Sequence, residues 1–284
     1  MIKTFISIIN KIRQIINILI ALPFLALFYI YINRGYFHYF DSNRDDDTRI
    51  RFINISWNCI CTMLNWTINY QIIYIGDSKI DLEKVTIVNG NHTHSNDLFI
   101  LFNLFNHNKL KGHQVTSIST INGIGEFDKK VLIQANSALV NGSKDDINNI
   151  IDSFKLWNLR KYNSAVIIFF EGIAKNDSKE QSKTLKHLLD PKTLGFALTA
   201  KYSKSKYMYD LNLIYTHQGK LMDSKDPSFT WLLFHPDTKI YVDLHKYELP
   251  SYEKAVKWIK DLYDMKDQQI DNIIKKYDIK LDQC

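Results

Sequence analysis

Residues 85–105, VTIVNGNHTHSNDLFILFNLF, decide how this sequence folds. The first apolar run is rich in β-branched residues and predicts a buried strand, and the apolar run that closes the stretch predicts a helix. Between them lies a short polar turn that contains His92, His94 and Asp97. A strand followed directly by a helix is the unit from which parallel sheets are built. A plain turn does not need two histidines and an aspartate, so this turn also indicates chemistry.

The alternation of strands and helices continues along the chain. Short runs of β-branched and aromatic residues predict strands, and apolar residues that recur on one face predict helices. The expected strands lie at 84–90, 113–120, 164–172, 209–217 and 238–249, and the expected helices at 95–107, 143–162 and 251–277. This order predicts an α/β fold with a mostly parallel central sheet flanked by helices. Ligands of such sheets bind beyond the carboxyl ends of the strands.

The composition excludes several classes of protein. The 284 residues are 45% hydrophobic and 23% charged, which argues against disorder and is sufficient for a sizeable core. The net charge of +6 is spread along the chain instead of forming a basic block, so no nucleic acid partner is expected. The three cysteines form neither a disulfide framework nor a zinc spacing, and the histidines lack the grouping of a metal site.

Two uncharged stretches precede the first of these strands. Residues 15–32, IINILIALPFLALFYIYI, are at the lower limit of the length that crosses about 30 Å of hydrocarbon, so we expect a retained membrane helix, with a buried core helix as the alternative. Residues 52–76 gather their asparagines on one side of a helix, which predicts an amphipathic helix at the membrane boundary or an ordinary core helix. The expected division is a membrane anchor with an amphipathic helix at 1–78, and an α/β domain with a C-terminal helix at 79–284.

Polar side chains follow two of the expected strands. His92 and Asp97 come after the strand at 84–90, and Glu171 and Gly172 close the run at 164–172. The carboxyl ends of parallel strands meet at one edge of a sheet, so the two clusters are expected at the same rim. Two such loops can form one site.

A histidine close to a carboxylate permits proton transfer. An imidazole titrates at about pH 6.5, so His92 is suited to removing a proton from an alcohol, and Asp97 is the natural partner of its second ring nitrogen. No serine or cysteine stands in a recognisable nucleophile elbow, so a covalent intermediate is not required. A capped helix start is the simpler explanation of the same two residues.

These residues also carry a resemblance to a known family. The sequence resembles the membrane-bound glycerolipid acyltransferases, in particular the branch of the lysophosphatidic acid and lysocardiolipin acyltransferases. Their first motif, NHxxxxD, is present as NHTHSND with Asn91, His92 and Asp97, and their third motif, FPEGTR, is similar to FFEGIAK. The segments LKHLLDPKTLGFALTA, around Pro191, and KAVKWIKDLYDMKDQQ resemble the same branch. The resemblance covers about residues 85–270.

The sequence departs from the family where two arginines are expected. Gly142 or Ser143 takes the place of the arginine in the second motif, and Ala174 replaces that of the third. Guanidinium groups hold phosphate through paired hydrogen bonds. The loss of these arginines therefore affects the binding of a phosphate-bearing acceptor more than it affects acyl transfer itself. The lysines that can substitute as point charges are Lys144, Lys175 and Lys179.

The resemblance implies an acyltransferase that moves a fatty acyl group from acyl-CoA to the free hydroxyl of a lysophospholipid, either lysophosphatidic acid or a related lysolipid. It implies His92 as the general base and Asp97 as the residue that orients it. The implied acceptor site consists of Asn91, Glu171, Gly172, Lys175 and Pro191. Acyl-CoA is a co-substrate, and no cofactor is implied. Membrane lipids are implied partners, in a membrane of the endoplasmic reticulum type with the catalytic domain facing the cytosol.

Two alternatives stand beside this hypothesis. One is a catalytically weakened, membrane-associated lipid-binding or scaffold protein of the same fold, which has lost its phosphate cations. The other is a membrane-anchored hydrolase that uses His92 with water.

Overall fold

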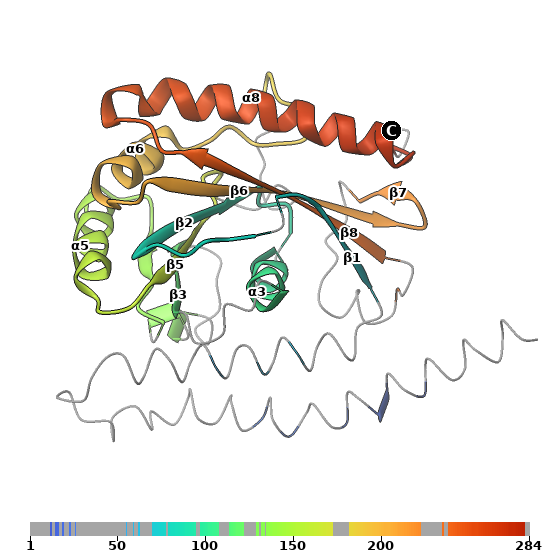
Figure 1. Cartoon of the computed structure of the whole chain (residues 1–284), viewed down its shortest axis with the longest axis horizontal. Coiled ribbons are helices and arrows are strands. Elements are labelled where there is room, and N and C mark those ends of the chain that lie inside the picture. Colours follow the sequence, from blue (N-terminus) through green and yellow to red (C-terminus); the bar gives the residue numbers. More distant parts are fainter. Residues whose placement is uncertain are drawn as a thin grey trace, which may run out of the picture.

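The computed structural model describes residues 70–77, 79–94, 97–107, 114–121, 135–172, 182–222 and 238–281. It also describes single residues at 12, 15, 16, 19, 23, 26, 55, 59, 62, 129, 130, 132, 133 and 235. The long described segments form an α/β unit in which a sheet lies between helices (Figure 1).

One sheet runs through the described segments. Its strands are β1 (Gln71–Gly76), β2 (Val85–Gly90), β3 (Gln114–Thr120), β4 (Ala138–Val140), β5 (Ser164–Ile168), β6 (Tyr207–His217), β7 (Lys220–Leu221) and β8 (Thr238–Glu248). Their order is β1-β8-β6-β2-β5-β3-β4, with β7 paired to β6. All pairings are parallel except those of β6 with β7 and with β8. The predicted, mostly parallel sheet is confirmed.

Helices cover both faces of the sheet (Figure 1). Helix α3 (Asp97–His107) lies on one face, and α5 (Asp146–Leu159), α6 (Thr193–Tyr202) and α8 (Tyr252–Lys276) lie on the other. One core cluster contains Leu104 of α3, and a second contains Phe196 of α6 and Ile259 of α8. Side chains alternate along a strand, so Ile87 and Val88 of β2 enter different clusters. Each face of β2 is therefore buried, as its unbroken apolar run requires.

The helix predicted for residues 52–76 is wrong at its C-terminal end. Its last six residues form β1, which pairs in parallel with β8, instead of continuing an amphipathic helix. The sheet consequently begins at Gln71, before the boundary that the sequence placed at residue 79. The apolar run QIIYIG is compatible with either a helix or a strand. It forms a strand because it pairs with β8, which lies more than 160 residues further along the chain.

The predicted membrane helix at 15–32 lies outside the described residues, apart from single positions. Ile15, Ile16 and Leu19 are helical, and their side chains are exposed. Within the described part of the chain, no helix combines the length and the apolar character that crossing a bilayer requires.

A buried ion pair ties α8 to the centre of the sheet. Lys266 Nζ donates to Asp210 Oδ1 of β6 over 2.8 Å and to the carbonyl oxygen of Leu211 over 2.6 Å. Both charged side chains are fully buried. Asn89 of β2 donates to the same oxygen of Asp210. A buried charge that loses its partner is strongly destabilising, so this network holds α8, β6 and β2 in one arrangement.

The ion pair gives a first prediction. Lys266→Met should lower the free energy of unfolding by about 3–5 kcal/mol, because Asp210 then stays buried without a counter-charge. The matched control is Lys257→Met on the same helix, since the Lys257–Asp261 pair is exposed and should contribute at most about 1 kcal/mol. Urea denaturation measures both, and equal losses in the two variants would contradict the prediction.

Candidate functional site

The two polar loops leave the sheet side by side. Strands β2 and β5 are parallel neighbours, with Asn89 opposite Ile168, so both carboxyl ends lie at the same rim. Directly beyond them, the His92 ring stacks on the Phe169 ring, with 4.3 Å between centroids and 16° between planes. Gly90 leaves the space for this contact, because a Cβ there would lie 3.3 Å from the Phe169 ring. The turn after β2 and the turn after β5 therefore form one site.

His92 and Asp97 form a hydrogen-bonded pair. The distance from His92 Nδ1 to Asp97 Oδ2 is 3.0 Å. The Asp97 side chain is fully buried, whereas that of His92 is 24% exposed. No described residue binds Nε2, the other ring nitrogen of His92. The imidazole is thus held by one nitrogen and can exchange a proton through the other.

Asp97 is held from two further directions. As the first residue of α3, it accepts hydrogen bonds at Oδ2 from the backbone N–H of Thr93 over 2.6 Å and of His94 over 2.9 Å. Its Oδ1 accepts the hydroxyl of Tyr215 over 2.7 Å. Sequence reasoning missed Tyr215, which lies 118 residues further along the chain. From the sequence one can expect only that a buried tyrosine hydroxyl has a hydrogen-bond partner, and this expectation does not identify Asp97 as the partner.

Asn91 fastens the turn to the sheet. Its Nδ2 donates to the carbonyl oxygen of Leu213 over 2.9 Å, and its Oδ1 accepts the Leu213 N–H over 2.6 Å. Nδ2 also donates to Thr93 Oγ1 over 2.8 Å. These bonds reproduce with a side chain the pairing that β2 makes with β6. The geometry therefore gives Asn91 a structural part in holding the turn, and its contact with a substrate stays a prediction.

Strand β5 ends at Ile168, and FFEG forms a tight turn. The N–H of Gly172 donates to the carbonyl oxygen of Phe169 over 2.9 Å. The N–H of Phe170 donates to Asn89 Oδ1 over 3.3 Å, and the Phe170 ring packs edge-on against Phe196. Gly172 has a φ of 78°, in the left-handed region that favours glycine. The turn is fixed at both ends, so Glu171 has a defined position.

Glu171 is buried and lies toward α8. Its exposed fraction is 1%. Burial, and then the negative charges of Glu171 and Asp210, hold the pKa of Tyr263 well above its ordinary value. Glu171 therefore lies close enough to Tyr263 of α8 to influence the pKa of its hydroxyl, whereas Phe169, two residues earlier, faces His92.

The segment that begins α6 closes over the FFEG turn. The N–H of Lys192 donates to the carbonyl oxygen of Phe170 over 2.6 Å, and the half-buried Pro191 directly precedes it. The Lys192 side chain lies along Gly172, where a Cβ would be 3.3 Å from Lys192 Cγ. Lys192 is exposed, and its Nζ makes no ion pair with any described residue. It is a cation at this turn that sequence reasoning missed, although it follows Pro191 directly.

The other expected cations lie elsewhere. Lys175, Ala174 and Lys179 are outside the described residues. Lys144 is exposed in the loop after β4, which is separated from β5 by β3 and so by about 10 Å. In that loop Gly142 has a φ of 87°, and Asp146 accepts its N–H over 2.7 Å. Among the residues that the structure describes, no group of His, Cys, Asp or Glu side chains is arranged to hold a metal ion.

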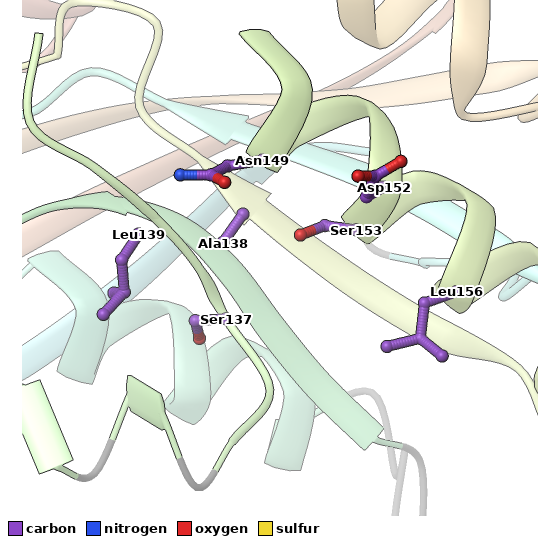
Figure 2. Close-up of a pocket in the computed structure, with 7 residues that line it drawn as sticks. All are labelled: Ser137, Ala138, Leu139, Asn149, Asp152, Ser153 and Leu156. Atoms are coloured by element: carbon purple, nitrogen blue, oxygen red, sulfur yellow. The ribbon is translucent and has the colours of Figure 1, made fainter. Parts of the chain in front are cut away.

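A shallow hollow lies at the edge of the sheet, away from this rim. Figure 2 shows its lining side chains, which come from β4, the residue before it, and α5: Ser137, Ala138, Leu139, Asn149, Asp152, Ser153 and Leu156. None of them belongs to the turns at His92 or Glu171. The hollow is therefore separate from the candidate site.

Comparison with solved structures shows a similarity in fold. No protein-family model matches the sequence, and no curated protein sequence matches it. The structure is similar to the crystal structure of the 1-acyl-sn-glycerophosphate (LPA) acyltransferase PlsC from Thermotoga maritima, with 16% sequence identity and a TM-score of 0.51. The alignment covers 91% of this chain and 98% of that chain. The chain has a glycerolipid acyltransferase-like fold, which agrees with the resemblance of its motifs.

The stack of His92 on Phe169 gives a second prediction. In Gly90→Ala the new methyl group should push the Phe169 ring away and shift the His92 ring protons in the NMR spectrum, because an aromatic ring changes the field at atoms stacked on it. Such crowding should destabilise the fold by roughly 1–3 kcal/mol. Gly195→Ala is the matched control, since nothing lies within 4 Å of its Cβ. His92 signals that stay unchanged in Gly90→Ala would contradict the stacked arrangement.

Proposed function

We propose that this protein is an acyltransferase that moves a fatty acyl group from acyl-CoA to the free hydroxyl of a lysophospholipid, lysophosphatidic acid or a related lysolipid. The observation that carries the proposal is the His92–Asp97 pair at a sheet rim, with Nδ1 bound and Nε2 available. The fold shared with the acyltransferase from Thermotoga maritima supports the reaction class. Neither argument requires a metal or a cofactor.

His92 is the general base in this proposal. Nε2 takes the proton of the acceptor hydroxyl while the hydroxyl oxygen attacks the thioester carbonyl carbon. The tetrahedral intermediate collapses, the C–S bond breaks, and the thiolate of CoA takes the proton back from Nε2. Asp97 keeps the His92 proton on Nδ1 and stabilises the imidazolium that forms between these steps. No acyl-enzyme is formed, so no nucleophilic side chain is needed.

The FFEG turn and the start of α6 are the proposed acceptor side of the site. Glu171 and Gly172 shape it, and the half-buried Pro191 supports the turn through the following residue. Lys192 is the cation we assign to an acceptor phosphate, because its ammonium group is exposed and lies on this turn. Lys175 remains a candidate from the sequence for the same task.

We also propose that the chain works at a membrane of the endoplasmic reticulum type, with the α/β domain facing the cytosol, where acyl-CoA is available. The acceptor then stays in the lipid, since each buried methylene of its acyl chain contributes about 0.8 kcal/mol. Exposed apolar side chains on helical residues of the N-terminal region, at Ile12, Ile15, Ile16 and Leu19, support contact with lipid.

The third prediction tests the base. In membranes given labelled acyl-CoA and a panel of lysophospholipids, His92→Ala should lower label incorporation by roughly 100-fold to 10,000-fold, because the hydroxyl loses its proton acceptor. His245→Ala is the matched control. His245 also pairs with a buried carboxylate, Asp243, over 2.8 Å and is 29% exposed, but it lies on the α8 face of the sheet. That variant should keep its activity per folded molecule.

Other outcomes of this assay identify the alternatives. Equal incorporation of the label by folded wild type and by folded His92→Ala would contradict the proposal. Release of free fatty acid without a lysolipid acceptor would indicate the hydrolase. Binding of lysophospholipid without any turnover would indicate the scaffold protein, in agreement with the loss of the family's two arginines, at Gly142 or Ser143 and at Ala174.

The fourth prediction concerns the head group. Lys192→Ala should raise the KM for lysophosphatidic acid by roughly tenfold with little change in kcat, because the ammonium group binds the phosphate before and during the reaction. The KM for an acceptor without phosphate, such as monoacylglycerol, should not change. Lys201→Ala, at the other end of α6, is the control and should change neither value. If Lys192→Ala changes the KM equally for both acceptors, Lys192 affects the folded structure and does not bind the phosphate.

A further inference from the structure

Asp97 receives a hydrogen bond from outside its own turn. Oδ2 faces His92 and two backbone N–H groups of the turn, whereas Oδ1 accepts the hydroxyl of Tyr215 over 2.7 Å. Both Tyr215 and Asp97 are buried, with exposed fractions of 1% and 0%. A hydroxyl bound to a buried carboxylate forms a charge-assisted bond, which is shorter and stronger than a neutral one.

Tyr215 occupies a rigid position. It lies in β6, which pairs with β8 along its whole length, and it stands opposite Ile240 in that ladder. Its ring packs in the core cluster on the α3 face and meets the His94 ring edge-on, with 4.7 Å between centroids. The hydroxyl therefore reaches Asp97 from a strand that is held by its own pairing and packing, apart from the turn.

This geometry limits the freedom of Asp97. A carboxylate held only through Oδ2 can rotate about its χ2 bond, and that rotation would move Oδ2 away from His92. The bond from Tyr215 to Oδ1 opposes this rotation from the other oxygen, in addition to the three bonds at Oδ2. It also draws negative charge toward Oδ1, which weakens the hold of Oδ2 on an imidazolium ring and makes it easier for His92 to return its proton.

We propose that Tyr215 is a positioning residue of the catalytic pair, which acts on His92 through Asp97. The inference rests on the proposed function, because it concerns the same base. Tyr215 touches neither substrate in this arrangement. Its effect is on the orientation of the imidazole and on the strength with which the pair holds a proton.

Tyr215→Phe is the direct test, since it removes the hydroxyl and keeps the ring. We expect kcat for acyl transfer to fall roughly 10-fold to 100-fold with little change in either KM, because the base is misplaced while the binding surfaces remain. The acid limb of the pH–rate profile should move to higher pH. Without the hydroxyl, Asp97 holds the imidazolium more strongly, so a higher pH is needed to free Nε2. His92 and His94 are described titratable residues that contact Asp97 or Tyr215.

Tyr209→Phe provides a matched control. Tyr209 lies in the same strand, is equally buried and belongs to the same core cluster, and its hydroxyl accepts the N–H of Asp81 over 2.9 Å. It is six residues from Tyr215 and so roughly 20 Å away along the strand. This variant loses a buried hydroxyl without touching the pair. It should lose stability and keep both kcat per folded molecule and the pH profile.

A second substitution tests the same idea with the opposite sign. Replacement of Tyr215 by a fluorinated tyrosine makes the hydroxyl a stronger donor, so the acid limb should move to lower pH. Thermal unfolding of each variant of the whole chain shows whether a loss of activity is explained by a loss of stability alone.

The outcomes separate the two proposals. If neither change at Tyr215 moves the acid limb while His92→Ala is inactive, the positioning role is wrong and the proposed function stands. If His92→Ala keeps wild-type activity, the proposed function itself is wrong.

Discussion

The buried carboxylate of Asp97 is the group on which the arrangement of the site depends. It accepts four hydrogen bonds: from the His92 ring, from two backbone N–H groups of the turn, and from Tyr215. A buried charge is tolerated only when it is paired and hydrogen-bonded, so the turn, the start of α3 and the middle of the sheet have to meet at this point. The imidazole is held in place by the same bonds that make the buried charge tolerable.

Strand β6 connects this turn to the rest of the domain. It provides Tyr215 to Asp97, the backbone of Leu213 to Asn91, and Asp210 to the buried Lys266 of α8. Asn89 extends the connection to the second loop, because its side chain binds both Asp210 and the N–H of Phe170. The two loops are therefore anchored to one another through side-chain amides, independently of the exposed residues around them.

The proposed acceptor side of the site is less constrained than the His92–Asp97 pair. A general base works only within hydrogen-bond reach of one proton, whereas a phosphate can be bound by a cation from any loop that reaches it. The exposed Lys192, whose side chain lies along Gly172 of the FFEG turn, is consistent with this difference. The difference also agrees with a shared fold over 91% of the chain at 16% identity, in which the backbone arrangement persists while most side chains differ.

The sequence by itself determined the strand and helix alternation, the parallel sheet, and the His92–Asp97 turn after β2, because periodicity and turn chemistry are local properties of the chain. It could not assign QIIYIG to β1, find α6, or identify Tyr215 and Lys192 as neighbours of the two turns. Each of those depends on which distant segment lies alongside: β8 for β1, β6 for Asp97, and the start of α6 for Gly172. Such contacts are decided by the packing of the whole domain, because partners that lie 20 to more than 160 residues apart leave no mark in either segment alone.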